Sequence, residues 1–175
     1  MIRKILLAKE PSLRLPSKPV RKIDKKIIQI VNDLKETLAT QKDPEGVGLA
    51  APQIGKNLRI FVAFWGKASL EVINPELVSV SNKLSEDSGN KDQLMEGCLS
   101  LPHFYGPLRR PDFVTIKYLT PQGQERLQKF TGFMAQIVQH ELDHLKGILF
   151  VDKLLEQKES LYKMVGEEWE EVELT

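Results

Sequence analysis

The spacing of apolar residues divides the chain into helical and extended segments. After a proline-rich opening segment, apolar residues recur every three or four positions from Ile27 to Leu38. Asp24 stands just before this run, where a side-chain oxygen can accept hydrogen bonds from the first turn, and Pro44 follows the run. The pattern predicts an amphipathic helix that begins after Asp24 and ends before Pro44.

The middle of the chain has the short apolar and β-branched runs that are typical of strands. They cover residues 59–65, 70–73, 77–80, 113–119 and 126–130. Gly66 separates the first two runs, and Pro121-Gln122-Gly123 predicts a turn that joins the last two as a hairpin. Between these groups, the polar segment 81–93 predicts an exposed loop.

Two helical patterns follow. Thr131 is a candidate N-cap for the first, whose apolar residues continue to Leu145 before Gly147 ends it. The second pattern begins at about Leu154 and continues into the acidic block 167–173. We interpret this block as a solvated terminus, because charge blocks at chain ends are usually solvated.

Length, composition and charge narrow the class of protein. With 175 residues, 41% of them hydrophobic and 28% charged, the chain has the size and composition of one globular domain, and we expect a single domain over residues 1–175. A net charge of +1 lacks the basic excess of a nucleic-acid binder. One cysteine excludes an intrachain disulfide, and no secretory signal or bilayer-spanning run of ~20 apolar residues is present. We expect a cytoplasmic protein that binds neither nucleic acid nor a membrane.

The strongest chemical signal is His140-Glu141-Leu142-Asp143-His144, inside a helical pattern. Residues four apart share one helix face, so the two imidazoles can reach one metal ion while Glu141 projects near its open side. The alternative is a pair of packed histidines with a surface glutamate. The pentapeptide alone leaves both interpretations open.

A catalytic zinc-type site uses three protein ligands and one open position, so a third donor is needed. The extended zinc-protease pattern places this donor at Phe150, which has no ligand atom. Cys98 and His103 are the remaining candidates. Cys98 is the better one, because a thiolate is a strong ligand and Gly97 allows close approach of the backbone. A buried free cysteine is the alternative.

Small residues gather in the segment Gly46–Gly55. They allow a ligand's backbone to lie against the protein backbone, and Gln53 offers an amide donor for a cleft. The alternative is a glycine-rich turn. A phosphate loop is a poor alternative, because the Lys-Ser/Thr ending and a following helix pattern are missing.

Together the three segments resemble the peptide deformylase family. Its motifs Gly-apolar-Gly-apolar-Ala-Ala-x-Gln, Glu-Gly-Cys-Leu-Ser and His-Glu-x-Asp-His match residues 46–53, 96–100 and 140–144, in the family's order. The resemblance extends over nearly the whole chain, through residues 74–76 and 145–152.

The resemblance implies an α+β fold, with antiparallel strands packed around the helix that carries the HExxH motif and with an N-terminal and a C-terminal helix. It implies removal of the formyl group from the N-terminal formyl-methionine of newly synthesised polypeptides, with release of formate. A divalent metal ion, Fe(II) or alternatively Zn(II), would activate the attacking water. The implied roles are metal ligation by Cys98, His140 and His144, acid/base catalysis by Glu141, and oxyanion binding by the Gln53 amide and the Leu99 backbone N–H.

For substrate binding, we expect Gly48 and Gly97 to flank an extended peptide that adds as a strand. The candidate walls of the methionine pocket are Val47, Leu94, Phe133 and Ile137, with membership of the core as the alternative for each. Family members with a basic C-terminal helix dock on the ribosome. Because this chain ends in acidic residues, its tail does not support more than a transient ribosome association.

Two further residues are candidates for support of the site. We expect Glu96 to form an exposed ion pair with Arg109 or Arg110, of the kind that contributes ~0–1 kcal/mol. Asp143 either orients a histidine or faces solvent, and solvent is the preferred interpretation.

Two other functions remain as hypotheses. The same helix occurs in zinc endopeptidases, although Phe150 and Cys98 argue against that class. A closed structural metal site needs four protein ligands, and His103 is the obvious spare donor.

Overall fold

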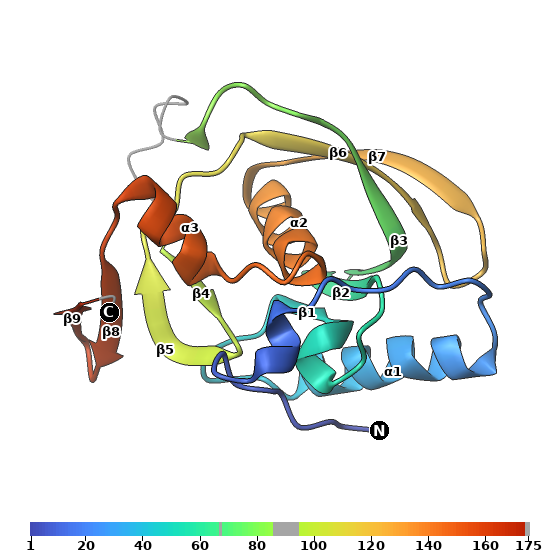
Figure 1. Cartoon of the computed structure of the whole chain (residues 1–175), viewed down its shortest axis with the longest axis horizontal. Coiled ribbons are helices and arrows are strands. Elements are labelled where there is room, and N and C mark those ends of the chain that lie inside the picture. The colour runs from blue at the N-terminus through green and yellow to red at the C-terminus, as the bar shows by residue number, and fades with distance from the viewer. Residues whose placement is uncertain (67, 86–94, 174–175) are drawn as a thin grey trace.

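The computed structural model describes residues 1–66, 68–85 and 95–173, and these contain three α-helices and nine strands (Figure 1). The helices are α1 (Lys25–Ala39), α2 (Gly132–Leu145) and α3 (Phe150–Gln157). The strands are β1 (Gly48–Ala50), β2 (Ile60–Trp65), β3 (Ala68–Val80), β4 (Glu96–Cys98), β5 (Leu101–Gly106), β6 (Phe113–Leu119), β7 (Glu125–Thr131), β8 (Leu161–Val165) and β9 (Glu168–Val172). Two short 3-10 helices are η1 (Pro11–Arg14) and η2 (Ala51–Ile54).

The strands form two sheets, with the orders β1-β2-β3-β6-β7 and β4-β5-β8-β9. Each pairing of neighbouring strands is antiparallel. The predicted α+β class is therefore confirmed. Figure 1 shows the five-stranded sheet curving around α2, with α1 outside it and α3 beside the four-stranded sheet. No helix in the described part of the chain is long and apolar enough to cross a bilayer.

Helix α1 confirms the first prediction from the apolar spacing. The Asp24 carboxylate accepts hydrogen bonds from the backbone N–H groups of Lys26 and Ile27, both at 3.0 Å, and so satisfies donors that a helix start leaves free. The helix ends at Ala39. Its apolar face packs against the outer side of the five-stranded sheet.

Strand β2 is buried on both faces, which explains its unbroken apolar run. Ile60 and Val62 belong to the cluster that α1 covers, whereas Phe61 belongs to the cluster that α2 covers. Successive side chains of a strand point to opposite faces, so a strand between two helices needs apolar residues at every position. The sheet thereby separates the two main cores.

The two runs predicted at 70–73 and 77–80 belong to one long strand, β3. Between Ile73 and Glu76 the pairing register with β6 shifts, and Asn74 takes a positive φ of 51°. Its side-chain amide accepts the Val20 N–H at 2.8 Å and donates to the Val20 carbonyl at 2.7 Å. This irregularity accommodates Pro75, which separates the two predicted runs in the sequence.

The β6–β7 hairpin and the start of α2 follow the prediction. The two strands pair from Phe113 opposite Thr131 to Leu119 opposite Glu125. Thr131 is the N-cap residue of α2, but its side chain makes no capping hydrogen bond. Gly147 follows the helix with a φ of 75°.

The predicted helix from Leu154 into the acidic block is wrong. Helix α3 ends at Gln157, and Lys158 follows it in the left-handed region at φ 57°. Residues 161–172 instead form the β8–β9 hairpin, with a turn at Gly166 (φ 64°). Leu161 enters the core while its neighbours along β8 are more exposed, which is the alternation of a strand. Glu168, Glu170 and Glu171 lie on edge strand β9, where charges discourage pairing with other chains.

The sequence pattern missed strands β4 and β5. Their segments are short and contain glycine and proline, and their pairing has a register shift at Cys98. Of the predicted loop 81–93, residues 86–93 lie outside the described residues.

The capping role of Asp24 makes a prediction about stability. Replacement of Asp24 by Ala is expected to lower the free energy of unfolding by about 1 kcal/mol, because two N–H groups lose their acceptor. Asp24→Ser should retain most of the stability. Urea unfolding followed by circular dichroism measures both variants, and equal stability of Asp24→Ala and the unmodified chain would contradict the capping role.

Candidate metal centre and substrate cleft

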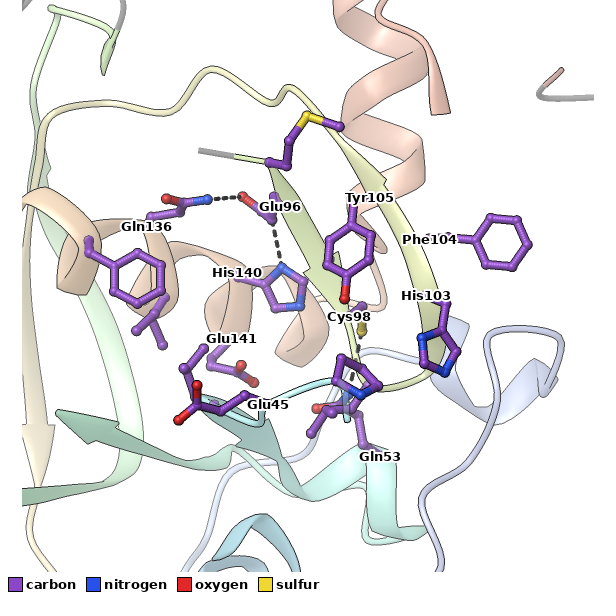
Figure 2. A pocket seen from close by; sticks show the side chains of 18 residues that line it. Glu45, Gln53, Glu96, Cys98, His103, Phe104, Tyr105, Gln136, His140 and Glu141 are labelled. Carbon is purple, nitrogen blue, oxygen red and sulfur yellow. Dashed lines mark hydrogen bonds and ion pairs between the residues drawn. The ribbon is translucent and has the colours of Figure 1, made fainter. Parts of the chain in front are cut away.

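Helix α2 and strand β4 bring Cys98, His140 and His144 together. One donor atom from each residue lies within 4.8 Å of the other two. The Cys98 Sγ is 3.3 Å from His144 Nε2, and the two imidazole centroids are 4.9 Å apart. His140 and His144 share one face of α2 because they are one helical turn apart. Strand β4 carries Cys98, which Figure 2 shows beside His140.

The chemistry of these three groups fits a divalent transition-metal cation. Burial by itself raises the pKa of the Cys98 thiol, but the adjacent His144 and His140 rings hold this pKa well below its ordinary value. A buried thiolate is stable only when a nearby positive charge, such as a metal cation, compensates it. Within the described structure the buried Nδ1 of His144 has no hydrogen-bond partner. Thiolate and imidazole are both ligands that zinc-type cations take in sites with three protein ligands.

A buried ion pair connects the ligands to the fold. Arg110 donates from Nε and Nη2 to the two Glu96 carboxylate oxygens, both at 2.7 Å. The two side chains are only 8% and 4% exposed. Burial raises the pKa of Glu96, but Arg110 outweighs it and lowers this pKa to about 2. The predicted pair with Arg110 is therefore present, but the expectation that it is exposed is wrong.

The same carboxylate orients a ligand. Glu96 Oε1 lies 2.6 Å from His140 Nδ1, and because Glu96 is ionised, the histidine N–H donates this bond. His140 therefore keeps Nε2 for a metal ion. Asp143 accepts a 3.0 Å hydrogen bond from Arg110 Nη1 with its side chain 13% exposed. The preferred interpretation of Asp143 as a solvent-facing residue is wrong, because Arg110 draws it inward.

Glu141 is buried, and it forms no ion pair in the part of the chain that the structure describes. It is 2% exposed, and its Oε2 has no hydrogen-bond partner among the described residues. Burial raises its pKa to about 7, against the opposing effect of His140 and His144. Gly48 on β1 makes room for this carboxylate: a β-carbon at position 48 would overlap Glu141 Oε1 and lie 3.1 Å from Ile137 Cγ2.

Gln53 of η2 directs its side-chain amide towards the Cys98 thiol. Its side-chain Oε1 accepts the Ala50 N–H at 2.8 Å, which turns Nε2 towards Ser100 Oγ at 3.1 Å and Cys98 Sγ at 3.6 Å. The segment 46–55 is therefore more than a glycine-rich turn, because it forms β1 and η2.

A cleft of about 320 Å³ opens in front of these groups (Figure 2). Most of the predicted site residues line it, namely Val47, Gly48, Gln53, Gly97, Cys98, Leu99, Phe133, Ile137, His140 and Glu141. Leu94 lies outside the described residues. His103 lines the cleft but is not one of the three residues whose donor atoms meet. Its Nδ1 lies 3.9 Å from an Asp43 carboxylate oxygen instead.

Sequence reasoning missed several lining residues, including Glu45, Met95 and Gln136. Gln136 precedes His140 by one helical turn, so the helical spacing was a usable signal. Its Nε2 lies 3.4 Å from Glu96 Oε2. Met95 and Glu45 carry no such signal, because only the tertiary structure places their segments beside α2.

Comparison with known proteins identifies the family. The sequence model described as polypeptide deformylase matches residues 2–160. The chain belongs to this family. The predicted resemblance is confirmed, and so is the expectation that the chain is an enzyme of the peptide deformylase type.

Individual family members are similar over most of the chain. A peptide deformylase of Pseudothermotoga lettingae is 41% identical over 152 residues, which cover 87% of this chain and 82% of that protein. The crystal structure from Thermotoga maritima has a TM-score of 0.79 at 33% identity, covering 87% of this chain and 97% of that one. A structure of the Acinetobacter baumannii enzyme with Met-Ala-Ser bound has a TM-score of 0.77 at 31% identity, covering 87% and 98%.

The buried ion pair makes a prediction about stability. Arg110→Met leaves the Glu96 charge buried without its partner and is expected to lower the free energy of unfolding by about 3–5 kcal/mol. Lys117→Met is the matched control, because the pair of Lys117 with Glu125 is exposed on both sides and should contribute less than about 1 kcal/mol. Urea unfolding compares the two variants. Equal losses would show that the buried pair has no special weight.

The ligand group makes a prediction about metal binding. Cys98→Ser is expected to weaken zinc binding by at least about 100-fold, since changes to residues that only hydrogen-bond the metal ligands already cost about 10–100-fold. His103→Ala should bind zinc as the unmodified chain does, because its ring is outside the group. Competition with a chromophoric chelator measures both. A large loss in His103→Ala would instead support the four-ligand structural site.

Proposed function

We propose that this chain removes the N-terminal formyl group from formyl-methionyl polypeptides and releases formate, with residues 1–175 acting as a single catalytic domain. The observation that carries the proposal is the meeting of Cys98, His140 and His144 next to a cleft that Cys98, His140 and Glu141 line, where the buried Glu141 Oε2 has no hydrogen-bond partner among the described residues. Membership of the family supports the same reaction. We place the reaction in the cytoplasm, where formylated polypeptides are synthesised.

The metal ligands in this proposal are Cys98, His140 and His144. A divalent ion in such a site supplies Lewis acidity and lowers the pKa of water from 15.7 to about 7. We propose Fe(II) as the native ion with Zn(II) as an alternative, since thiolate and imidazole donors suit both. Glu96 and Arg110 keep His140 oriented towards the ion through the bond to Nδ1.

Glu141 acts as the general acid and base. Because Oε2 has no hydrogen-bond partner in the described structure, it is available to the attacking water. Burial raises the pKa of this carboxylate, which favours its taking a proton from this water. The same proton then goes to the nitrogen of the departing amine, which completes the release of formate.

Gln53 and Leu99 bind the oxygen that becomes negative during attack. The Ala50 N–H holds Gln53 Oε1, so the amide presents its N–H side to the cleft. The Leu99 backbone N–H is the second donor of the proposal, and its residue also lines the cleft. Loss of one such donor typically costs about 10²–10³ in rate.

The peptide is proposed to bind as an extended strand between Gly48 and Gly97. The structure with Met-Ala-Ser bound in the Acinetobacter baumannii relative supports a peptide that begins with methionine. In this chain Val47, Phe133 and Ile137 line the cleft and would surround the methionine side chain, with Leu94 as a further candidate. Phe133 is 37% exposed and packs 6.2 Å from the Trp65 ring, so this wall lies at the edge of the cleft. Transient ribosome association stays a prediction.

The role of Glu141 makes the central prediction about activity. Glu141→Gln is expected to lower kcat by about 10²–10⁴, because the amide cannot carry the proton. The variant should retain the metal, since Glu141 is not a ligand in the proposal. Formate release from formyl-Met-Ala-Ser and elemental analysis measure the two properties.

The outcomes separate the competing functions. Ordinary turnover by Glu141→Gln contradicts the assigned acid/base. Cleavage of internal peptide bonds without formate supports a zinc endopeptidase. Metal retention with neither activity in the unmodified chain supports a structural metal site.

A further inference from the structure

The β8–β9 hairpin lies outside residues 2–160, the part of the chain that the family model matches. It extends the sheet that carries Cys98, in the order β4-β5-β8-β9 (Figure 1). The register joins β8 to β5 at two positions, Phe104 opposite Lys163 and Tyr105 opposite Tyr162. Both β5 residues line the cleft. The hairpin is therefore attached at the cleft wall itself.

Trp169 of β9 makes a specific contact with this wall. Its ring centroid lies 5.3 Å from that of Tyr105, with an interplanar angle of 83°. This is the edge-to-face arrangement that aromatic pairs prefer. Trp169 is 45% exposed, so its ring is not a member of the hydrophobic core. The contact reaches Tyr105 from β9, which lies beyond β8 in the sheet order β4-β5-β8-β9.

Tyr105 in turn covers Gly97. The two residues are opposite each other in the β4–β5 register, and a β-carbon at position 97 would lie 2.6 Å from the Tyr105 ring. The ring therefore rests against the backbone of Gly97, next to Cys98. Figure 2 shows Tyr105 in the cleft wall, beside the strand that carries Glu96 and Cys98.

We propose that Trp169 is a positioning residue for the substrate: by holding Tyr105 against Gly97, it fixes the part of the cleft wall where the peptide backbone beyond formyl-methionine binds. This inference rests on the proposed function. The hairpin therefore affects peptide affinity and not the chemical step, since among the described contacts neither the Tyr105 ring nor the Trp169 ring touches Glu141 or a proposed metal ligand.

The hairpin has other anchors, so loss of the Trp169 ring does not detach it. Leu161 is 5% exposed and packs with Phe150 and Leu154 of α3. The Lys163 amine lies 5.8 Å above the Phe104 ring. Without the indole, Tyr105 loses its outer support while the β8–β5 pairing remains.

The test measures formate release from formyl-Met-Ala-Ser by the metal-loaded full chain. Trp169→Ala is expected to raise KM about threefold to tenfold and to leave kcat within about twofold, on the usual strength of an edge-to-face pair. Trp169→Phe should restore most of the affinity. Val165→Ala is the matched control, because Val165 is an equally exposed apolar residue of the same hairpin, at 44%, and should leave both constants unchanged.

A double-mutant cycle tests whether the effect passes through Tyr105. If it does, Trp169→Ala adds nothing to KM once Tyr105→Ala is present. The ring-current shift of the Tyr105 protons, measured by NMR, should disappear in Trp169→Ala and persist in Val165→Ala. Additive effects on KM, an unchanged KM in Trp169→Ala, or a loss confined to kcat would overturn the inference.

The two proposals fail in distinguishable ways. Absence of formate release from the unmodified, metal-loaded chain overturns the proposed function. The positioning role can still be tested without turnover. Calorimetry measures the binding of formyl-Met-Ala-Ser to the Glu141→Gln chain and to the chain that carries both Glu141→Gln and Trp169→Ala. An equal dissociation constant in the two chains overturns the inference even where formate release is normal.

Discussion

The buried contact between Arg110 and Glu96 is the constraint on which the site depends. Arg110 binds a carboxylate on β4 and, through Asp143, a carboxylate on α2, so one guanidinium joins the strand that carries the thiol to the helix that carries the histidines. Charges in a protein interior are tolerated when they are paired and hydrogen-bonded, as the Arg110 guanidinium is with Glu96 and Asp143. Because Glu96 also accepts the His140 Nδ1–H, the same contact selects the ring nitrogen that faces the metal site.

Two buried carboxylates close to one another acquire opposite properties from their partners. Glu96 is matched with a cation and its pKa is lowered to about 2, so it is a permanent anion. Glu141 forms no ion pair with the described residues, and burial raises its pKa to about 7, which suits a group that exchanges protons at neutral pH. The first carboxylate holds the site in place, and the second is available for chemistry. Neither property belongs to glutamate itself.

The cleft depends on glycines as much as on ligands. Gly48 lets β1 lie against Glu141, and Gly97 lets the Tyr105 ring lie against β4. A side chain at position 48 would collide with Glu141, and one at position 97 would collide with the Tyr105 ring. The hairpin that supports Tyr105 extends this arrangement beyond the matched family residues, which gives the four-stranded sheet a part in substrate binding as well as in holding Cys98.

Local patterns in the sequence determined α1, the β6–β7 hairpin, the helix with His140 and His144, and the three motifs that identify the family, because helical spacing, turn residues and capping act between near neighbours in the chain. The tertiary structure decided the rest. The acidic end has a helical pattern but forms strand β9, because β9 pairs with β8 and β8 pairs with β5. Glu96 and Asp143 turn inward because Arg110 lies between them. Tyr105 and Trp169 meet across strands that are far apart in sequence. These outcomes depend on long-range pairing and burial, and such contacts leave no recognisable pattern among residues that are neighbours in the sequence.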